Sequence, residues 1–140
     1  MADLVVYINE KITLDGNDRG VLTTQTIPEI SYIDNRIFNL SSGSVTTLFS
    51  LSDTTGPGTF TTSSIKYVRI TNKSTTVPVK LIVSSSTEAM SYLINTGSSY
   101  MLSTSKITSS LTNLTFNDIV SIQAEPSSSN AAIEYFIATT

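Results

Sequence analysis

The sequence contains no cysteine, no histidine and no tryptophan. Without cysteine the chain can build no disulfide framework and offers no thiolate to a metal. Without histidine it also lacks the commonest protein ligand of zinc, copper and haem, and the usual general base of enzymes. These absences exclude most metal cofactors and most familiar catalytic sites, so we expect neither a cofactor nor enzyme activity.

Charge is scarce as well, since acidic and basic residues together make up 14% of the chain. The eight basic residues are scattered between Lys11 and Lys106, and the formal net charge is −3. Nucleic-acid binding depends on clustered lysine and arginine side chains that neutralise phosphates. The sequence therefore predicts that neither DNA nor RNA is a partner.

Long apolar runs are also missing. The longest strictly apolar run, Leu4–Ile8, is far shorter than the roughly 20 residues that a membrane-spanning helix needs. The amino terminus lacks the basic patch and extended apolar stretch of an export signal. We expect a soluble chain with no membrane partner.

What the sequence has in abundance is hydroxyl groups, because serine and threonine supply 45 of its 140 residues. β-branched residues and alternation of apolar and polar residues recur along the whole chain, whereas helical periodicity does not. The predicted strands are Leu4–Leu14, Ile27–Leu40, Val45–Leu51, Ile65–Asn72, Pro78–Ser84, Met90–Asn95, Ser99–Leu102, Ile119–Ala124 and Ala131–Ala138. Turn-forming residues separate them at Asp15–Gly20, Gly56–Gly58, Asn72–Thr76, Asn95–Gly97 and Pro126–Asn130.

This spacing of strands and turns is typical of an all-β fold, and it predicts an antiparallel, jelly-roll-like β-sandwich. We expect one domain over residues 1–140, with residues 1–25 as an N-terminal strand or as an arm engaged in subunit contacts. The Ser/Thr-rich segment Ser103–Thr115 is expected to be an irregular loop rather than a short helical turn. Alternation predicts inward-facing side chains at Val68, Ile70, Val79, Leu81, Val83, Val120, Ile122, Ala124, Ile133, Tyr135 and Ile137.

Two predicted strands carry large apolar side chains on both faces. In the first strand Leu4, Val6 and Ile8 alternate with Val5 and Tyr7, and the last strand combines a core face with Phe136. A solvated outer face would then expose a contiguous apolar patch. Each strand is therefore either interior to the fold or covered by another copy of the protein. The candidate interface residues are Leu4, Val5, Val6, Tyr7, Ile8, Tyr135 and Phe136.

Asp15 and Asp18 are the one close pair of carboxylates, and they lie within a glycine-rich segment. Their oxygen atoms suit a hard cation such as calcium, but the order of residues does not match an EF-hand loop. Asp and Asn also occur in turns because their side chains bond to the nearby backbone. We favour the turn.

Aromatic side chains offer a further possibility. Tyrosine rings beside serine and threonine hydroxyls suit carbohydrate, which makes a carbohydrate-binding adhesion module an alternative function. The six tyrosines fall mostly within predicted strands, which favours core or interface positions. They are Tyr7, Tyr32, Tyr67, Tyr92, Tyr100 and Tyr135.

The run Tyr67–Asn72, the run Val79–Val83 after a polar turn, and the segment Ala132–Ala138 resemble small β-rich virion proteins of tailed bacteriophages, including phages of cyanobacteria. The Ser/Thr-rich composition without cysteine or histidine is similar too. The resemblance covers about the last half of the chain, and it brings no catalytic residues with it.

The resemblance implies a capsid decoration protein that stabilises the head, or alternatively a tail- or fibre-associated component. It also implies a homo-oligomer, with a trimer favoured, that contacts the major capsid protein or other virion proteins. The expected location is the virion, assembled in the host cytoplasm.

Overall fold

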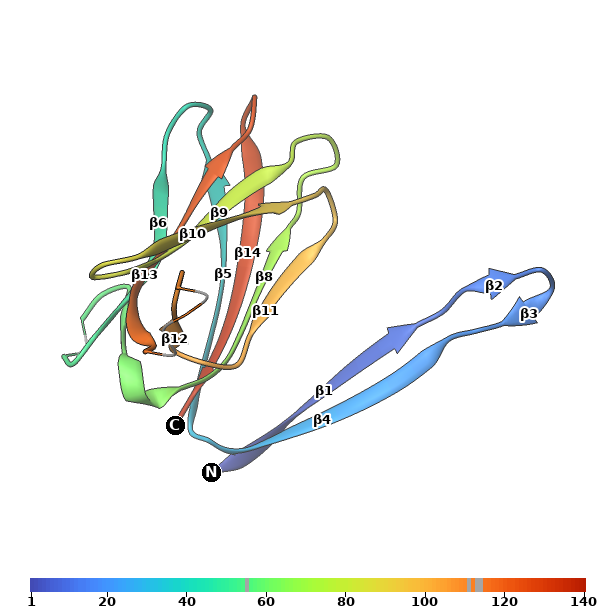
Figure 1. The fold of residues 1–140 in the computed structure, drawn as a ribbon, viewed down its shortest axis with the longest axis horizontal. Coiled ribbons are helices and arrows are strands. Elements are labelled where there is room, and N and C mark those ends of the chain that lie inside the picture. The colour runs from blue at the N-terminus through green and yellow to red at the C-terminus, as the bar shows by residue number, and fades with distance from the viewer. Residues whose placement is uncertain (55, 111, 113–114) are drawn as a thin grey trace.

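Two stacked β-sheets form the body of the protein, and a long β-hairpin projects from one end of it (Figure 1). The computed structural model describes residues 1–54, 56–110, 112 and 115–140. Within them no α-helix occurs, and one 3-10 turn, η1, spans Thr62–Ser64. The predicted all-β sandwich is therefore confirmed.

The larger sheet has the strand order β10-β9-β13-β6-β7, and β12 pairs with one end of β13. The smaller sheet has the order β11-β8-β14-β5. All pairings are antiparallel except that of β6 with β7. The strands of the larger sheet are β6 (Thr46–Ser52), β7 (Thr59–Thr61), β9 (Val79–Ser85), β10 (Ala89–Ile94), β12 (Lys106–Ile107) and β13 (Asn117–Pro126). Those of the smaller sheet are β5 (Tyr32–Leu40), β8 (Ile65–Asn72), β11 (Ser99–Leu102) and β14 (Ala131–Thr139).

The core lies between the facing sides of the two sheets. Because strand side chains alternate between faces, every second residue of the central strands points into it. Most predicted core residues are confirmed, and these are buried: Val68, Ile70, Val79, Leu81, Val83, Ile122, Ala124, Ile133, Tyr135 and Ile137. Phe49 and Tyr135 meet across the sheets with ring centroids 5.6 Å apart.

Val120 is the exception, because the predicted alternation in β13 fails there. The pairing of β13 with β9 shifts register between Ile119 and Ser121, and such a bulge moves the following side chains to the opposite face. Ile119 is therefore buried and Val120 is exposed. The bulge cannot be seen in the alternation of residue types alone.

Asn72 is a buried polar residue at the end of β8. Its side-chain amide donates to the carbonyl oxygens of Val77 (2.8 Å) and Ile94 (3.1 Å), and its Oδ1 accepts from the Ser74 backbone N–H at 2.9 Å. Its backbone N–H donates to the Ser98 carbonyl at 3.0 Å. Asn72 thus satisfies several buried backbone groups where the β8–β9 and β10–β11 connections meet.

The first two predicted strands are wrong in their bounds. The expected strand Leu4–Leu14 is β1 (Ala2–Glu10) followed by the short β2 (Thr13–Leu14), which pairs with β3 (Asn17–Asp18). The expected strand Ile27–Leu40 is divided at Ser31, where β4 (Val21–Ile30) ends and the chain enters the body.

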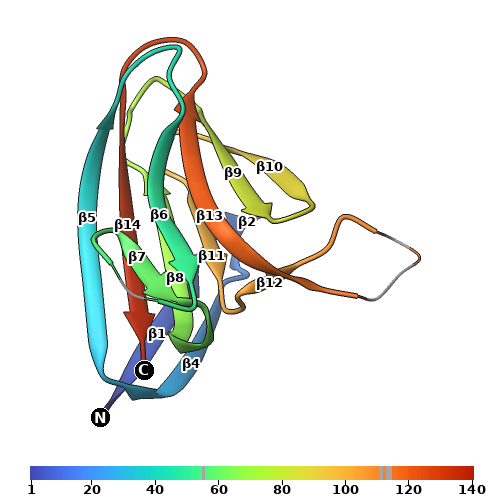
Figure 2. The ribbon, with the colours of Figure 1, turned by 90° about the vertical axis from the view of Figure 1, so that its left-hand side faces the viewer.

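Two other regions depart from the sequence prediction. The expected loop Ser103–Thr115 contains β12, and its residues 111, 113 and 114 lie outside the described part of the chain. The short strand β7 was not predicted from the sequence. Figures 1 and 2 both place the two termini at the same end of the body.

Candidate functional site

The hairpin of β1 and β4, called the arm here together with its tip β2–β3, is the most unusual feature of the molecule. The two strands pair from Ala2 opposite Ile30 to Glu10 opposite Val21, and together they form a two-stranded sheet. Figure 1 shows that only one end of the arm touches the body. A two-stranded hairpin alone is marginally stable in water, so this arm needs further contacts.

The base of the arm packs on the outer face of the smaller sheet. Ile27 and Ile30 of β4 are buried there together with Tyr67 and Ala138, and Leu4, Val6 and Phe136 are packed against this cluster. The ring centroids of Tyr67 and Phe136 lie 6.3 Å apart. This cluster explains why β14 carries apolar side chains on both faces, because the chain's own arm covers part of the second face.

The register of the arm shifts once near its base, between Ala2 and Leu4. Opposite this point Glu29 has a φ of 64°, a left-handed conformation that side chains other than glycine seldom adopt. The irregularity lies next to Pro28, which cannot donate a backbone hydrogen bond. This bulge is where the arm joins the body.

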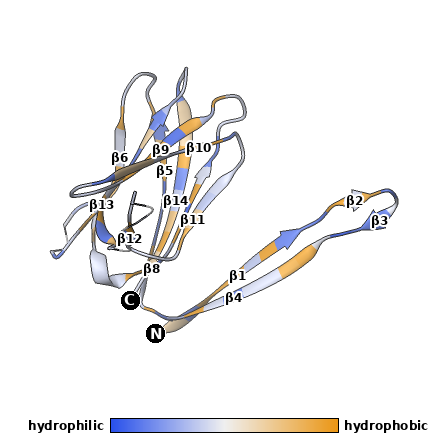
Figure 3. Ribbon diagram, viewed as in Figure 1, coloured by the Kyte–Doolittle hydropathy of each residue, from blue (hydrophilic) through white to orange (hydrophobic). Residues whose placement is uncertain are grey.

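Beyond the base the arm leaves apolar side chains in water. Tyr7 is 69% exposed and Leu22 is 64% exposed. Val5, Tyr7 and Leu22 share a face, because Leu22 pairs with Asn9 two residues after Tyr7. Val21 on the other face is also exposed, as are Ile12 and Leu14 near the tip. Figure 3 shows apolar residues along both strands of the arm.

The structure separates the seven predicted interface residues into four groups. Val5 and Tyr7 are exposed on the arm, while Leu4, Val6 and Ile8 are half-buried on its opposite face. Tyr135 is 1% exposed within the core, so its assignment to an interface is wrong. Phe136 is half-buried against the base of the arm and has little surface left for a partner. Alternation places Tyr135 with Ile133 and Ile137, and this signal already favoured a core position.

Sequence reasoning missed most of the return strand of the arm, since only Ile27–Ile30 of β4 lies within a predicted strand. Val21 and Leu22 were not assigned to any strand, although threonines 23, 24 and 26 are good strand formers. The alternation of apolar and polar residues in β4 is weak, because most of its side chains are exposed and only Ile27 and Ile30 are buried. The hairpin runs from Ala2 to Ile30 and so extends past residue 25, the expected end of an N-terminal strand or arm. That this segment makes subunit contacts stays a prediction.

The predicted turn at Asp15 and Asp18 is present at the tip of the arm. Asp15 and Gly16 have φ values of 51° and 76°, as a two-residue hairpin turn requires. The Asp18 side chain accepts a bond from the Gly20 backbone N–H at 3.2 Å. Within the part of the chain that the structure describes, no group of three or more acidic residues could hold a metal ion.

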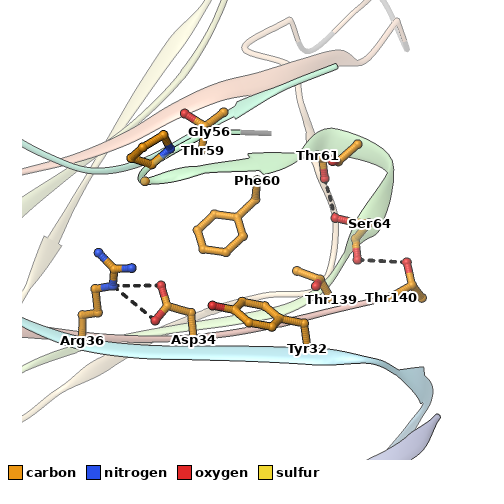
Figure 4. Close-up of a pocket in the computed structure, with 12 residues that line it drawn as sticks. Tyr32, Asp34, Arg36, Gly56, Thr59, Phe60, Thr61, Ser64, Thr139 and Thr140 are labelled. Carbon is orange, nitrogen blue, oxygen red and sulfur yellow. Dashed lines mark hydrogen bonds and ion pairs between the residues drawn. The ribbon is translucent and has the colours of Figure 1, made fainter. Parts of the chain in front are cut away.

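A second candidate site lies at the edge of the body, between β5 and β7. Tyr32, Asp34 and Arg36 of β5 line a pocket of about 380 Å³, closed on the other side by the segment 56–61 (Figure 4). The Asp34 carboxylate accepts a bond from the Tyr135 hydroxyl at 2.7 Å and lies 3.0 Å from Arg36 Nε. Burial, reinforced by this bond, raises the pKa of Tyr135 well above its usual range.

The remaining tyrosines differ widely in their surroundings. Tyr67 is buried, and the rings of Tyr92 and Tyr100 contact each other in a tilted arrangement with centroids 4.8 Å apart. Tyr7 and Tyr32 are the exposed ones. Of the six rings considered for carbohydrate binding, these two present an open face to a ligand.

Comparisons of the chain with protein-family models, with curated proteins and with solved structures found no significant match. The described residues include no helix of the length and hydropathy needed to cross a membrane. The arm and the pocket are therefore the features from which we infer the function of the chain.

Proposed function

We propose that the protein is a structural subunit of a phage virion, a capsid decoration protein that stabilises the head and is held in place by its arm. The observation that carries this proposal is the projecting hairpin whose apolar side chains its own chain leaves uncovered. A soluble protein rarely exposes contiguous apolar surface unless a partner covers it. The bacteriophage origin comes from the sequence resemblance.

The order of the strands supports a jelly-roll description of the body. We number the eight main strands 1 to 8 along the chain as β5, β6, β8, β9, β10, β11, β13 and β14. The smaller sheet then has the order 1-8-3-6 and the larger sheet 2-7-4-5, which is the order of an eight-stranded jelly roll. Jelly rolls are frequent in viral capsid proteins and in lectins, so the architecture fits the proposal without deciding it.

The partner proposed for the arm is a neighbouring copy of the chain, in a trimer, with the major capsid protein beneath it. Association would bury the face that holds Val5, Tyr7 and Leu22 and would add the contacts that a lone hairpin lacks. Specific interfaces usually bury more than about 1,000 Å² in total. An arm of this length, contacted along its strands, provides a surface suited to that requirement.

Charge is distributed unevenly between arm and body. Residues 1–30 contain five acidic and two basic residues, a net charge of −3, while residues 31–140 contain six of each. The whole net charge of the chain therefore resides in the arm. Because the arm is acidic, we expect it to bind a neutral or basic surface. If that surface is basic, the association of the arm with it should weaken at high salt.

The mass of the purified protein in solution tests the assembly. We expect a trimer for the full chain, measured by light scattering after gel filtration. The double variant Tyr7→Ser, Leu22→Ser should be a folded monomer, because both side chains lie on the proposed contact face. Leu93→Ser is the matched control, since Leu93 is equally exposed but belongs to β10.

The virion location has a test of its own. Mass spectrometry of intact purified particles should find this chain, and its absence from them would contradict the proposal. A tail- or fibre-associated position is the second candidate, since an arm serves assembly there as well. Particles separated into heads and tails would distinguish the two locations.

A further inference from the structure

The inner face of β5 changes character along its length. Leu40 is buried and Phe38 is packed against the core, as alternation requires, but Asp34, Arg36 and Tyr32 occupy the next positions of the same face. The strand opposite them, β7, contains only Thr59–Thr61. The pocket shown in Figure 4 lies at this edge, between β5 of the smaller sheet and β7 of the larger one.

A carboxylate on this face is costly to the fold. The Asp34 side chain is 11% exposed, and removing a carboxylate from water costs several kcal/mol unless partners compensate for it. The Tyr135 hydroxyl and Arg36 Nε are its partners. An apolar residue here would extend the core at lower cost, so the polar group points to a role other than stability.

The chemical groups around the pocket are complementary to a sugar. Phe60 projects from β7 toward β5, and Tyr32, 54% exposed, lies along the opposite wall (Figure 4). The Phe60 ring packs edge-to-face with Phe49, with ring centroids 5.8 Å apart, and this contact holds it in place. Hydroxyl groups complete the lining, from Thr59, Thr61, Ser64, Thr139 and Thr140. Aromatic rings receive the apolar face of a sugar, and hydroxyls and carboxylates bond to its edge.

The charges of the pocket select among ligands. Asp34 and Arg36 neutralise each other, so the site has no excess charge to attract an anion. Arg36 uses its Nε in the ion pair with Asp34. The two terminal nitrogens of the Arg36 guanidinium make no hydrogen bond within the described part of the chain. These donors and the remaining acceptor capacity of Asp34 suit neutral hydroxyl groups, each of which donates and accepts.

We propose that the pocket between β5 and β7 binds one neutral hexose unit of a polysaccharide, stacked on Tyr32 and Phe60 and bonded to Asp34 and Arg36. This activity goes beyond the assembly role and does not depend on the arm. It would give the protein a second contact, to a cell-surface or extracellular glycan.

Ligand-detected NMR of the full chain tests the proposal, with glucose, galactose, mannose and N-acetylglucosamine as probes at millimolar concentration. We expect at least one of them to bind. Tyr32→Ala should weaken that binding about tenfold or more, because it removes a stacking ring. Tyr7→Ala is the control, because Tyr7 is an exposed tyrosine on the arm that does not line the pocket, and this variant should bind the sugar as the wild type does.

Backbone amide shifts provide the second readout. The bound sugar should shift the signals of residues 32–36 and 59–61 and leave those of the arm unchanged. Three results would overturn the proposal: none of the four sugars binds, Tyr32→Ala binds as tightly as the wild type, or the shifts fall outside the pocket. Because both substituted side chains are exposed, we expect both variants to fold, and circular dichroism checks this.

Discussion

The arm and the sandwich are both built of antiparallel β-strands but are stabilised in different ways. In the sandwich each central strand has neighbours on both sides and a second sheet above it, so side chains such as Ile122 and Ile133 are completely buried. In the arm each strand has one neighbour, and Tyr7 and Leu22 remain in water. Strand pairing alone does not make a stable element. Under our proposal a partner completes the arm, whereas the sandwich is completed by its own two sheets.

The largest effect is expected in the core of the sandwich. Phe49 is buried and touches the rings of Phe60 and Tyr135. Phe49→Ala should lower the free energy of unfolding by about 3–5 kcal/mol, because it removes apolar contacts and leaves a cavity. Chemical denaturation measures this loss. Leu93→Ala at an exposed position is the control and should change the free energy of unfolding by about 0.5 kcal/mol or less.

Removal of the buried amide should have the next largest effect. Asn72→Ala leaves the carbonyl oxygens of Val77 and Ile94 without their donor. Since each unsatisfied buried group costs about 1–3 kcal/mol, we expect the free energy of unfolding to fall by roughly 2–4 kcal/mol. Asn35→Ala, exposed on β5, should have almost no effect. Equal losses in the two variants would contradict the role given to Asn72.

Alkaline pH should weaken the sandwich through Tyr100. Burial, together with the neighbouring Tyr92, raises the pKa of Tyr100 to about 12. The unfolded chain ionises its tyrosines near pH 10, so this contribution is present below that pH and is lost as the pH rises toward 12. Between pH 10 and 12, the thermal unfolding temperature of Tyr100→Phe should fall less steeply with pH than that of the wild type. Met101→Leu on the same strand removes no titratable group and should follow the wild type.

The smallest effect on global stability is expected from a change within the arm. A Cβ at Gly20 would lie 2.3 Å from the Glu10 carbonyl oxygen, so Gly20→Ala must displace the backbone there. The sandwich should keep its unfolding temperature, whereas the outer arm should lose the pairing of Glu10 with Val21 and with it the assembly. Gly43→Ala is not a suitable control because Gly43 has a positive φ. Gly56→Ala in a body loop, where a Cβ meets no atom within 4 Å, is the better one.

The sandwich could be predicted from the sequence much better than the sites could. Burial on one face gives β8, β9 and β14 a clear alternation, and their core residues follow from it. The bulge at Val120 and the break at Ser31 depend on pairing partners far away in the sequence, which alternation does not reveal. The pocket forms where β5 lies opposite the segment 56–61, and no local pattern near Tyr32 or Asp34 indicates that this distant segment lies there.

Hydrogen exchange followed over a dilution series tests the dependence of the arm on a partner most directly. We predict that the backbone amides that link β1 with β4 are protected at high protein concentration and exchange rapidly once the oligomer dissociates. The amides of β13 and β14 should keep their protection at every concentration. Arm amides that stay equally protected in a chain of monomeric mass would contradict the account, because the hairpin would then be stable alone.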